Sequence, residues 1–232
     1  MDAIPMRRRV QVGSEPEREG PAGAWHRVPI AVAPGVVVTV LEAADAERVL
    51  SDALESGSDP YAAIVWPSGI AAAGEIVRHV RPGERVLDLG AGTGLCALTA
   101  ARVGARATAL DHDPRALELI GRAAALQGLL VEARPFDLAS ADDLPPADVV
   151  VLADVLYERA LARVAARRTL EVLARGGRVL VGDPERVGRE DFVAELDAAG
   201  IHVHFEERWV TPPGERRARV GVAWLPGTEP GG

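Results

Sequence analysis

The sequence predicts an α/β fold in which helices cover both faces of a mostly parallel sheet that ends in an antiparallel hairpin. From about residue 85, short β-rich runs alternate with helical segments, which is the pattern of successive βαβ units. A glycine-rich turn follows the first of these runs. The last two apolar runs flank TPPGE with no helical segment between them, so we expect them to pair antiparallel.

Apolar periodicity and turn residues give the predicted elements. Five parallel strands followed by a hairpin make a seven-stranded sheet, whereas a dinucleotide-binding domain would continue with another βαβ unit. A separate hairpin is predicted before the sheet, where β-branched runs flank APG. The predicted strands lie at 28–32, 36–41, 85–89, 105–110, 129–134, 149–153, 178–181, 201–210 and 219–225, and the predicted helices at 44–54, 70–80, 94–103, 114–127, 159–174 and 189–199.

The 232 residues are enough for one α/β domain and too few for two of ordinary size. The first residues are rich in Gly, Pro, Glu and Arg without apolar periodicity, which is typical of disorder. We therefore expect a disordered arm, one domain with an N-terminal extension or lid, and a flexible tail. Their predicted ranges are 1–24 for the arm, 25–226 for the domain (25–67 extension, 68–226 core) and 227–232 for the tail.

Composition argues against several classes of protein. No apolar stretch approaches the roughly 20 residues that span a bilayer, and the N-terminus resembles neither a signal nor a transit peptide. We therefore expect a cytoplasmic protein without membrane contact. We also expect a monomer. Cys96 is the only cysteine, and no Cys/His cluster has ligand spacing, so no metal is expected. The net charge of −8 disfavours nucleic acid as a partner.

The segment VLDLGAGTG carries the strongest local signal. Gly90, Gly92 and Gly94 punctuate the turn that follows a strand, and glycines there allow close approach of a ligand across the carboxyl ends of the strands. Leu95 stands where the dinucleotide fingerprint G-x-G-x-x-G has its third glycine. Asp88 favours a ligand with an amino group over one with a pyrophosphate. The loop therefore favours S-adenosylmethionine over NAD, with a purely structural turn as the alternative.

The second predicted strand ends in ALDHDP. Asp111 follows the loop by about 20 residues, where a carboxylate can accept hydrogen bonds from both ribose hydroxyls. Asp113 is better placed to cap the helix that begins at Pro114. His112 is a candidate for contact with adenine, and a surface histidine is the alternative.

The third and fourth strands end in further polar residues. Asp137 in RPFDL falls where an adenine amino group would lie, with Leu138 able to pack on the ring, and a capping role for Asp137 is the alternative. Asp154 in VVVLADVLYE is the first polar residue after a fully apolar strand, which favours ligand contact. Tyr157 should point into the same cleft.

Taken together, the segments DPYAAIVWPSG, VLDLGAGTG, ALDHDP, VVVLADVLYE and VLVGDPER, which span residues 59–186, resemble the seven-β-strand protein lysine methyltransferases. DPYAAIVWPSG and GDPER are most similar to the branch that acts on the β subunit of the electron-transfer flavoprotein. The resemblance implies a Rossmann-like class I methyltransferase fold, S-adenosylmethionine as cofactor and methyl transfer to protein lysines. The first 58 residues and the last hairpin match no motif.

The resemblance also implies individual roles. The glycine loop, with Ala91 inside it, would line the methionine part of the cofactor, and Trp66 would pack near the cofactor, although a core tryptophan is the alternative. Asp154 and Tyr157 match the acidic-x-x-aromatic motif at the acceptor lysine. By the same likeness Asp88 would contact the amino group, Asp111 the ribose and Asp137 the adenine.

Three other functions stay open. The same cofactor core serves small-molecule N- and O-methyltransferases. A nucleic-acid amino methyltransferase would carry D/N-P-P-Y where this chain has DVLY. A non-catalytic adenosylmethionine-binding protein would leave Asp154 and Tyr157 without a purpose.

Overall fold

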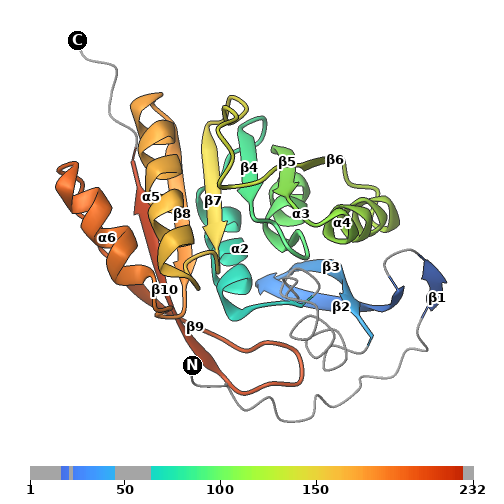
Figure 1. Ribbon diagram of the computed structural model, residues 1–232. Coiled ribbons are helices and arrows are strands. Elements are labelled where there is room, and N and C mark those ends of the chain that lie inside the picture. The colour runs from blue at the N-terminus through green and yellow to red at the C-terminus, as the bar shows by residue number, and fades with distance from the viewer. Residues whose placement is uncertain (1–16, 21–22, 45–63, 227–232) are drawn as a thin grey trace.

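The computed structural model describes residues 17–20, 23–44 and 64–226, and these form two sheets with helices against them (Figure 1). The large sheet has seven strands in the order β6-β5-β4-β7-β8-β10-β9. The first five are parallel, while β10 runs antiparallel to both of its neighbours. The predicted fold class is confirmed. The strands are β4 (Arg85–Leu89), β5 (Arg106–Asp111), β6 (Val131–Pro135), β7 (Val149–Ala153), β8 (Arg178–Asp183), β9 (Glu206–Val210) and β10 (Ala218–Leu225).

Helices cover both faces of this sheet, as its apolar strands require. Successive residues of β7 point to opposite faces, and all of them are apolar. Val149 and Val151 pack with α2 (Pro67–His79) and α3 (Leu95–Arg102), while Val150 and Leu152 pack with α5 (Arg159–Ala174) and α6 (Arg189–Ala198). The fifth described helix, α4 (Pro114–Leu126), lies beside α3 on the same face.

A small antiparallel sheet covers the outer side of α2, α3 and α4. It consists of β1 (Glu17–Gly20), β2 (Gly23–Ala33) and β3 (Val36–Ala43), and its apolar side chains form one cluster with residues of the three helices. β2 and β3 contain the predicted hairpin and extend beyond it. β1 lies inside the segment that the sequence indicated as disordered. Glu17 and Gly20 of this segment pair with β2.

Three local predictions differ from the structure or fall outside it. The predicted strand 201–210 pairs only from Glu206, because Ile201, Val203 and Phe205 pack against the cluster beneath α5 and α6. The other predicted strands and helices of the core shift by no more than a few residues. The predicted helix 44–54 and most of DPYAAIV lie outside the described residues.

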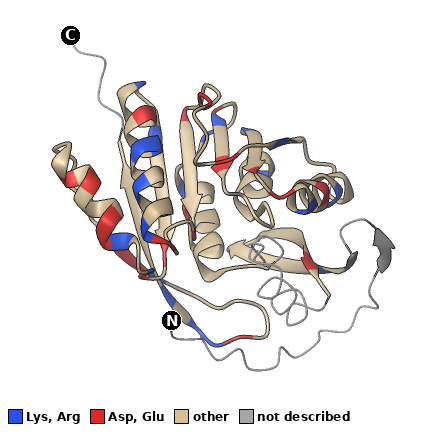
Figure 2. Ribbon diagram, viewed as in Figure 1, with Lys and Arg blue, Asp and Glu red and all other residues tan. Residues whose placement is uncertain are grey.

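Basic residues predominate along α5 and acidic residues along α6 (Figure 2). Arg159 and Arg163 on α5 pair with Asp191 on α6 at 3.0 and 2.7 Å, so the outer surface of the two helices carries mixed charge. In the part of the chain that the structure describes, no helix has both the length and the apolar character needed to cross a bilayer.

One buried carboxylate joins α2 to the antiparallel end of the sheet. Glu75 is 1% exposed and accepts a 2.8 Å hydrogen bond from Arg208 Nε on β9. Burial alone would raise its pKa, but the hydrogen bonds and positive charges of Arg208 and Arg78 together lower the pKa below 4.5. The ionised form is therefore the one that the folded protein stabilises.

We predict that Glu75→Gln lowers the free energy of unfolding by about 1 to 3 kcal/mol at pH 7, because hydrogen bonds to charged groups contribute that much. A lowered pKa in the folded state contributes stability above the unfolded pKa that is lost as the pH falls through the folded value. The gap between wild type and variant should therefore close on acidification. Urea unfolding between pH 3 and 7 measures it, with the exposed Glu206→Gln, which loses its bond to the same Arg208, as the control.

Candidate functional site

The candidate site lies where parallel strands end. β4, β5, β7 and β8 pair in parallel with Leu89 beside Leu110 and Ala153 beside Gly182, so the segments that follow these strands emerge at one edge of the sheet. Most of the predicted site residues lie at this edge, where ligands generally bind in open α/β sheets.

The glycine loop adopts a backbone that side chains disfavour. Gly90, Gly92 and Gly94 have φ angles of 74°, 54° and 71°, in the left-handed region. The N–H groups of Gly90 and Ala91 donate to Leu110 O at 2.9 and 3.1 Å, and that of Gly94 donates to Ala91 O at 2.7 Å. The loop is thus pinned to the end of β5 by its own backbone.

Close packing adds a second reason for two of these glycines. A Cβ atom at Gly94 would lie 2.5 Å from Ile120 Cγ1, and one at Gly90 would lie 2.9 Å from Val155 Cγ1. The second contact places the segment after β7 directly against the loop. The two predicted parts of the site, the glycine loop and DVLY, are therefore neighbours.

Asp88 lies beneath the loop, where it supports α3. Its side chain is 2% exposed, and Oδ2 accepts a 2.9 Å hydrogen bond from the N–H of Ala97, the third residue of α3. The helix has Gly94 at its N-cap and no side-chain cap of its own, so Asp88 satisfies one of its first N–H groups. Burial raises the Asp88 pKa to about 7, opposed by the Ala97 hydrogen bond and assisted by the charge of Asp111. The predicted contact with an amino group stays a prediction.

Asp111 joins the loop to the segment after β5. Oδ2 accepts from Gly92 N at 2.8 Å and Oδ1 from Asp113 N at 2.9 Å, and the residue is 4% exposed. Burial raises the Asp111 pKa, and these two hydrogen bonds oppose the rise. Asp113 itself caps α4 through Arg115 N at 2.8 Å, as predicted. His112 is exposed, with Nδ1 3.6 Å from Asp111 Oδ1.

These carboxylates suit a cationic ligand. Among the described residues, Asp88 and Asp111 have backbone N–H groups as hydrogen-bond partners, and His112 is the one side chain near enough to ion-pair with either of them. Burying two carboxylates without a strong cation is unfavourable, and a ligand bearing an ammonium and a sulfonium would offset that cost. A pyrophosphate would be repelled. The described residues include no group of three or more His, Cys, Asp or Glu arranged to hold a metal ion.

Asp137 and Leu138 lie farther along the edge, after β6. Asp137 is exposed, and its Oδ1 accepts from Ala139 N at 2.8 Å, which is the capping contact considered as its alternative role. The Leu138 side chain is buried in the core cluster beneath α5. Contacts of these residues with adenine stay predictions.

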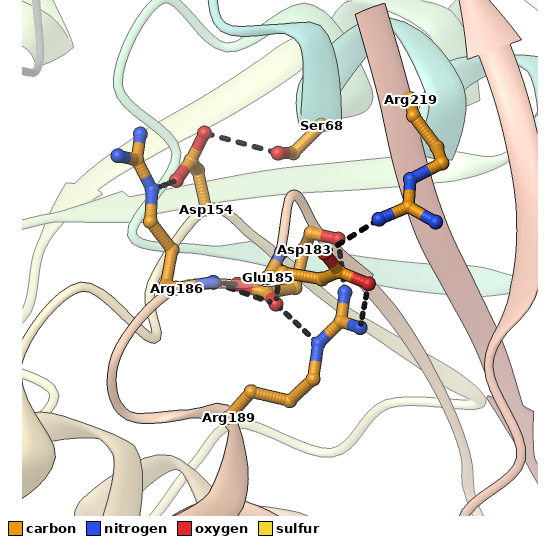
Figure 3. A network of polar contacts seen from close by, with 7 residues as sticks. All are labelled: Ser68, Asp154, Asp183, Glu185, Arg186, Arg189 and Arg219. Atoms are coloured by element: carbon orange, nitrogen blue, oxygen red, sulfur yellow. Dashed lines mark hydrogen bonds and ion pairs between the residues drawn. The ribbon is translucent and has the colours of Figure 1, made fainter. Parts of the chain in front are cut away.

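Asp154 is strained and buried at the end of β7. It has φ of 63°, which is uncommon for a residue other than glycine, and it is 8% exposed. Oδ1 accepts a 2.6 Å hydrogen bond from Arg186 Nε, and Oδ2 accepts a 3.0 Å bond from Ser68 Oγ at the start of α2 (Figure 3). Tyr157 is half-buried three residues later.

Arg186 comes from the GDPER segment after β8. The Asp183 carboxylate, 0% exposed, accepts from Glu185 N and Arg186 N and from Arg189 Nε at 2.6 Å, which orders this turn (Figure 3). The guanidinium carbon of Arg186 lies 5.2 Å from the ring centroid of Trp66. Trp66 is half-buried and immediately precedes α2.

The sequence did not single out Ser68, Asp183 or Arg186 as site residues. Asp183 could have been found, because it is a polar residue that follows an apolar strand, just as Asp154 does. Ser68 and Arg186 lie in the quoted WPSG and GDPER segments, but their contact with Asp154 depends on strand order.

Residues 86–177 match the family model described as "Methyltransferase domain". The described residues have the fold of class I methyltransferases. The chain is 36% identical over 138 residues to the electron transfer flavoprotein beta subunit lysine methyltransferase of Xenopus laevis, covering 55% of this chain and 54% of that protein. The resemblance indicated by the sequence is thus confirmed. The match implies S-adenosylmethionine as the cofactor of the methyltransferase domain, in agreement with the charge of the site.

Other relatives have names that refer to different acceptors or pathways. The ribosomal protein L11 methyltransferase of Thermus thermophilus is 36% identical over 46% of this chain and 41% of that protein. The ubiquinone biosynthesis O-methyltransferase of a Caulobacter species is 33% identical over 57% and 51%. The chain therefore spans about half the length of the curated relatives it matches.

Solved structures show the same fold. TrmN from Thermus thermophilus is 27% identical, with a TM-score of 0.55 over 72% of this chain and 52% of that one. A TehB-like SAM-dependent methyltransferase from Corynebacterium glutamicum is 17% identical, with a TM-score of 0.53 over 80% and 99%.

We predict that Asp88→Asn stabilises the ligand-free methyltransferase domain at pH 8 by about 1 to 4 kcal/mol, because the amide can still accept from Ala97 N without a buried charge. A raised folded pKa means that the neutral carboxyl stabilises the fold fully below pH 3.8 and that this contribution is lost as the pH rises to about 7. The advantage of the variant should grow between those values and then level off. Chemical unfolding from pH 5 to 8 tests this, with the exposed Asp137→Asn as a control that should show no such trend.

We predict that Asp111→Asn weakens binding of S-adenosylhomocysteine about 10- to 100-fold, because the amide cannot accept from both Gly92 N and Asp113 N. Isothermal titration calorimetry measures the change. Asp148→Asn, the same substitution at the opposite end of β4, where Asp148 pairs with Arg85, should bind as wild type does. An unchanged dissociation constant for Asp111→Asn would remove Asp111 from the cofactor site.

Proposed function

We propose that this chain transfers methyl groups from S-adenosylmethionine to lysine side chains of a protein, with the β subunit of the electron-transfer flavoprotein as the first candidate. The observation that carries the proposal is the placement of Asp154. Asp154 is buried, has a strained backbone and directly precedes Val155, which packs against Gly90 of the glycine loop, and it begins the acidic-x-x-aromatic segment that ends at Tyr157. Strain of this kind costs about 1 to 3 kcal/mol and is concentrated at functional sites.

The chemistry requires little covalent participation by the protein. The bound cofactor supplies a methyl group activated by a sulfonium; the nitrogen lone pair forms a bond to the methyl carbon while the carbon–sulfur bond breaks, and its electron pair stays on sulfur. The protein has to hold the acceptor nitrogen in line behind that carbon. Asp154 can accept a hydrogen bond from an N–H of the acceptor, and Trp66 and Tyr157 are available as aromatic neighbours.

Two relatives that act on proteins support a protein acceptor, and they match the chain about equally well. The similarity to a ubiquinone biosynthesis O-methyltransferase favours a small-molecule acceptor as the second candidate. The two differ in charge, because a lysine brings an ammonium with a reference pKa near 10.4. The pH dependence of the rate can therefore distinguish the two candidates, and the acidic-x-x-aromatic segment that ends at Tyr157 favours the first.

We predict that Asp154→Asn lowers kcat for methylation of the recombinant flavoprotein β subunit about 100-fold, while affinity for S-adenosylhomocysteine changes less than threefold. The reason is that Asp154 would lie where the cofactor methyl group and the acceptor nitrogen meet, so that its charge matters more for turnover than for cofactor affinity. Tritiated-methyl transfer and mass spectrometry of the labelled lysine measure the rate. Asp148→Asn, which lies at the opposite end of β7, is the matched control.

Equal rates for wild type and Asp154→Asn would dismiss Asp154 from the reaction. If the flavoprotein subunit is not labelled, purified ribosomal protein L11 and a panel of small phenols and amines are the next acceptors. Labelling of the phenols alone would replace the lysine proposal with its small-molecule alternative.

A further inference from the structure

Two strained residues lie in one polar network. Among the described residues, Asp154 and Glu185 are the two that are not glycine and have positive φ, at 63° and 69°. They follow β7 and β8, which are neighbours in the sheet, and Arg186 connects them, since it follows Glu185 and pairs with Asp154 (Figure 3). Backbone strain persists where surrounding contacts hold a residue in place. Arg186 links the two strained residues, so we expect its position to be fixed as well.

The contacts around the turn fix the backbone that carries the side chain of Arg186. Asp183 receives the N–H groups of Glu185 and Arg186 and the guanidinium of Arg189. Arg219 on β10 pairs with Glu185 at 2.7 Å. Three elements therefore hold the turn in place: β8 through Asp183, β10 through Arg219 and α6 through Arg189.

The Arg186 side chain ends against the acceptor carboxylate. Nε lies 2.6 Å from Asp154 Oδ1, and the guanidinium stacks over Trp66. Both partners are largely removed from water, with the Arg186 side chain 22% exposed and that of Asp154 6% exposed. Each Asp154 oxygen has one partner, since Arg186 Nε donates to Oδ1 and Ser68 Oγ donates to Oδ2. A carboxylate has about four lone-pair sites. Asp154 can therefore accept a further hydrogen bond from an N–H of an acceptor.

The charge of this pair matters for a lysine. A buried carboxylate without a counter-charge stabilises an approaching ammonium and raises its pKa, yet methyl transfer needs the neutral amine. A guanidinium on the same carboxylate cancels most of that field and leaves the oxygen able to accept a hydrogen bond.

We infer that Arg186 is a positioning residue of the transfer site, which holds the Asp154 carboxylate and neutralises its charge, so that Asp154 orients the acceptor amine without stabilising its protonated form. This inference rests on the proposed function and deepens it. Arg186 would thereby favour the neutral amine form of an acceptor that is otherwise a cation.

Neighbouring charges do not replace that of Arg186. The two other arginines of the network already have acidic partners, since Arg189 pairs with Asp183 and Arg219 with Glu185 and Glu207. On α2 the contact with Asp154 is the uncharged Ser68. The titratable or charged side chains on the segments around Asp154 are Tyr157 and Glu158 after β7, and Asp183, Glu185 and Arg189 after β8.

The test compares pH–rate profiles for methylation of a protein lysine. Arg186→Gln leaves the Asp154 charge uncompensated, so the midpoint should move up by about one pH unit and the rate at pH 7 should fall about 10-fold, with recovery at high pH. Asp154→Asn leaves the Arg186 charge uncompensated, so its midpoint should move down, on a lower plateau. Arg186→Lys keeps the charge and should keep the wild-type midpoint. Arg163→Gln, the same substitution on the outer side of α5, should leave the profile unchanged.

The opposite shifts of Arg186→Gln and Asp154→Asn distinguish this role from a structural one. A lower plateau with an unmoved midpoint for Arg186→Gln would overturn the inference and leave lysine methylation in place. A faster Arg186→Gln enzyme at pH 7 would also overturn it, because the guanidinium would then be blocking the acceptor. A wild-type enzyme that methylates only hydroxyl acceptors would overturn both this inference and the proposed function. Dissociation constants for S-adenosylhomocysteine, measured for every variant, establish that each one folds and binds.

Discussion

The parallel pairing of β5, β4, β7 and β8 is the constraint on which the site depends. Parallel strands in register end at the same edge of a sheet, so Asp111, the glycine loop, Asp154 and Asp183 emerge together although they are far apart in the chain. Such strands are buried on both faces. Apolar residues therefore fill them, and polar groups gather where they end.

The polar groups at this edge are mainly carboxylates. Those at the ends of β4 and β5 have different partners from those at the ends of β7 and β8. At the ends of β4 and β5, Asp88 and Asp111 are held largely by backbone N–H groups, and burial raises both pKa values. At the ends of β7 and β8, Asp154 and Asp183 each have an arginine. The first pair leaves negative potential for a cationic cofactor. The second pair is close to charge balance, which would suit the proposed acceptor, a lysine that reacts as the neutral amine.

The glycine loop illustrates how packing and binding requirements coincide. Gly90 and Gly94 are needed by the fold itself, because a Cβ would collide with Val155 or Ile120. The same absence of side chains leaves the backbone open at the edge of the sheet. Asp88 and Asp111 also support α3 and the loop through hydrogen bonds from backbone N–H groups, and their burial without a strong cation suits a cationic ligand.

The sequence alone predicts the succession of strands and helices along the core, the seven-stranded sheet, the glycine loop and the residues that follow each strand. These features are local, since periodicity, glycines and the first polar residue after an apolar run can be read along the chain. The tertiary structure decided which of those residues share a contact. Asp88 accepts a hydrogen bond from α3, and Asp154 accepts hydrogen bonds from Ser68 and Arg186. Those partners lie up to 86 residues apart, and no local pattern fixes them, because they meet only once the strands have paired and the helices have packed.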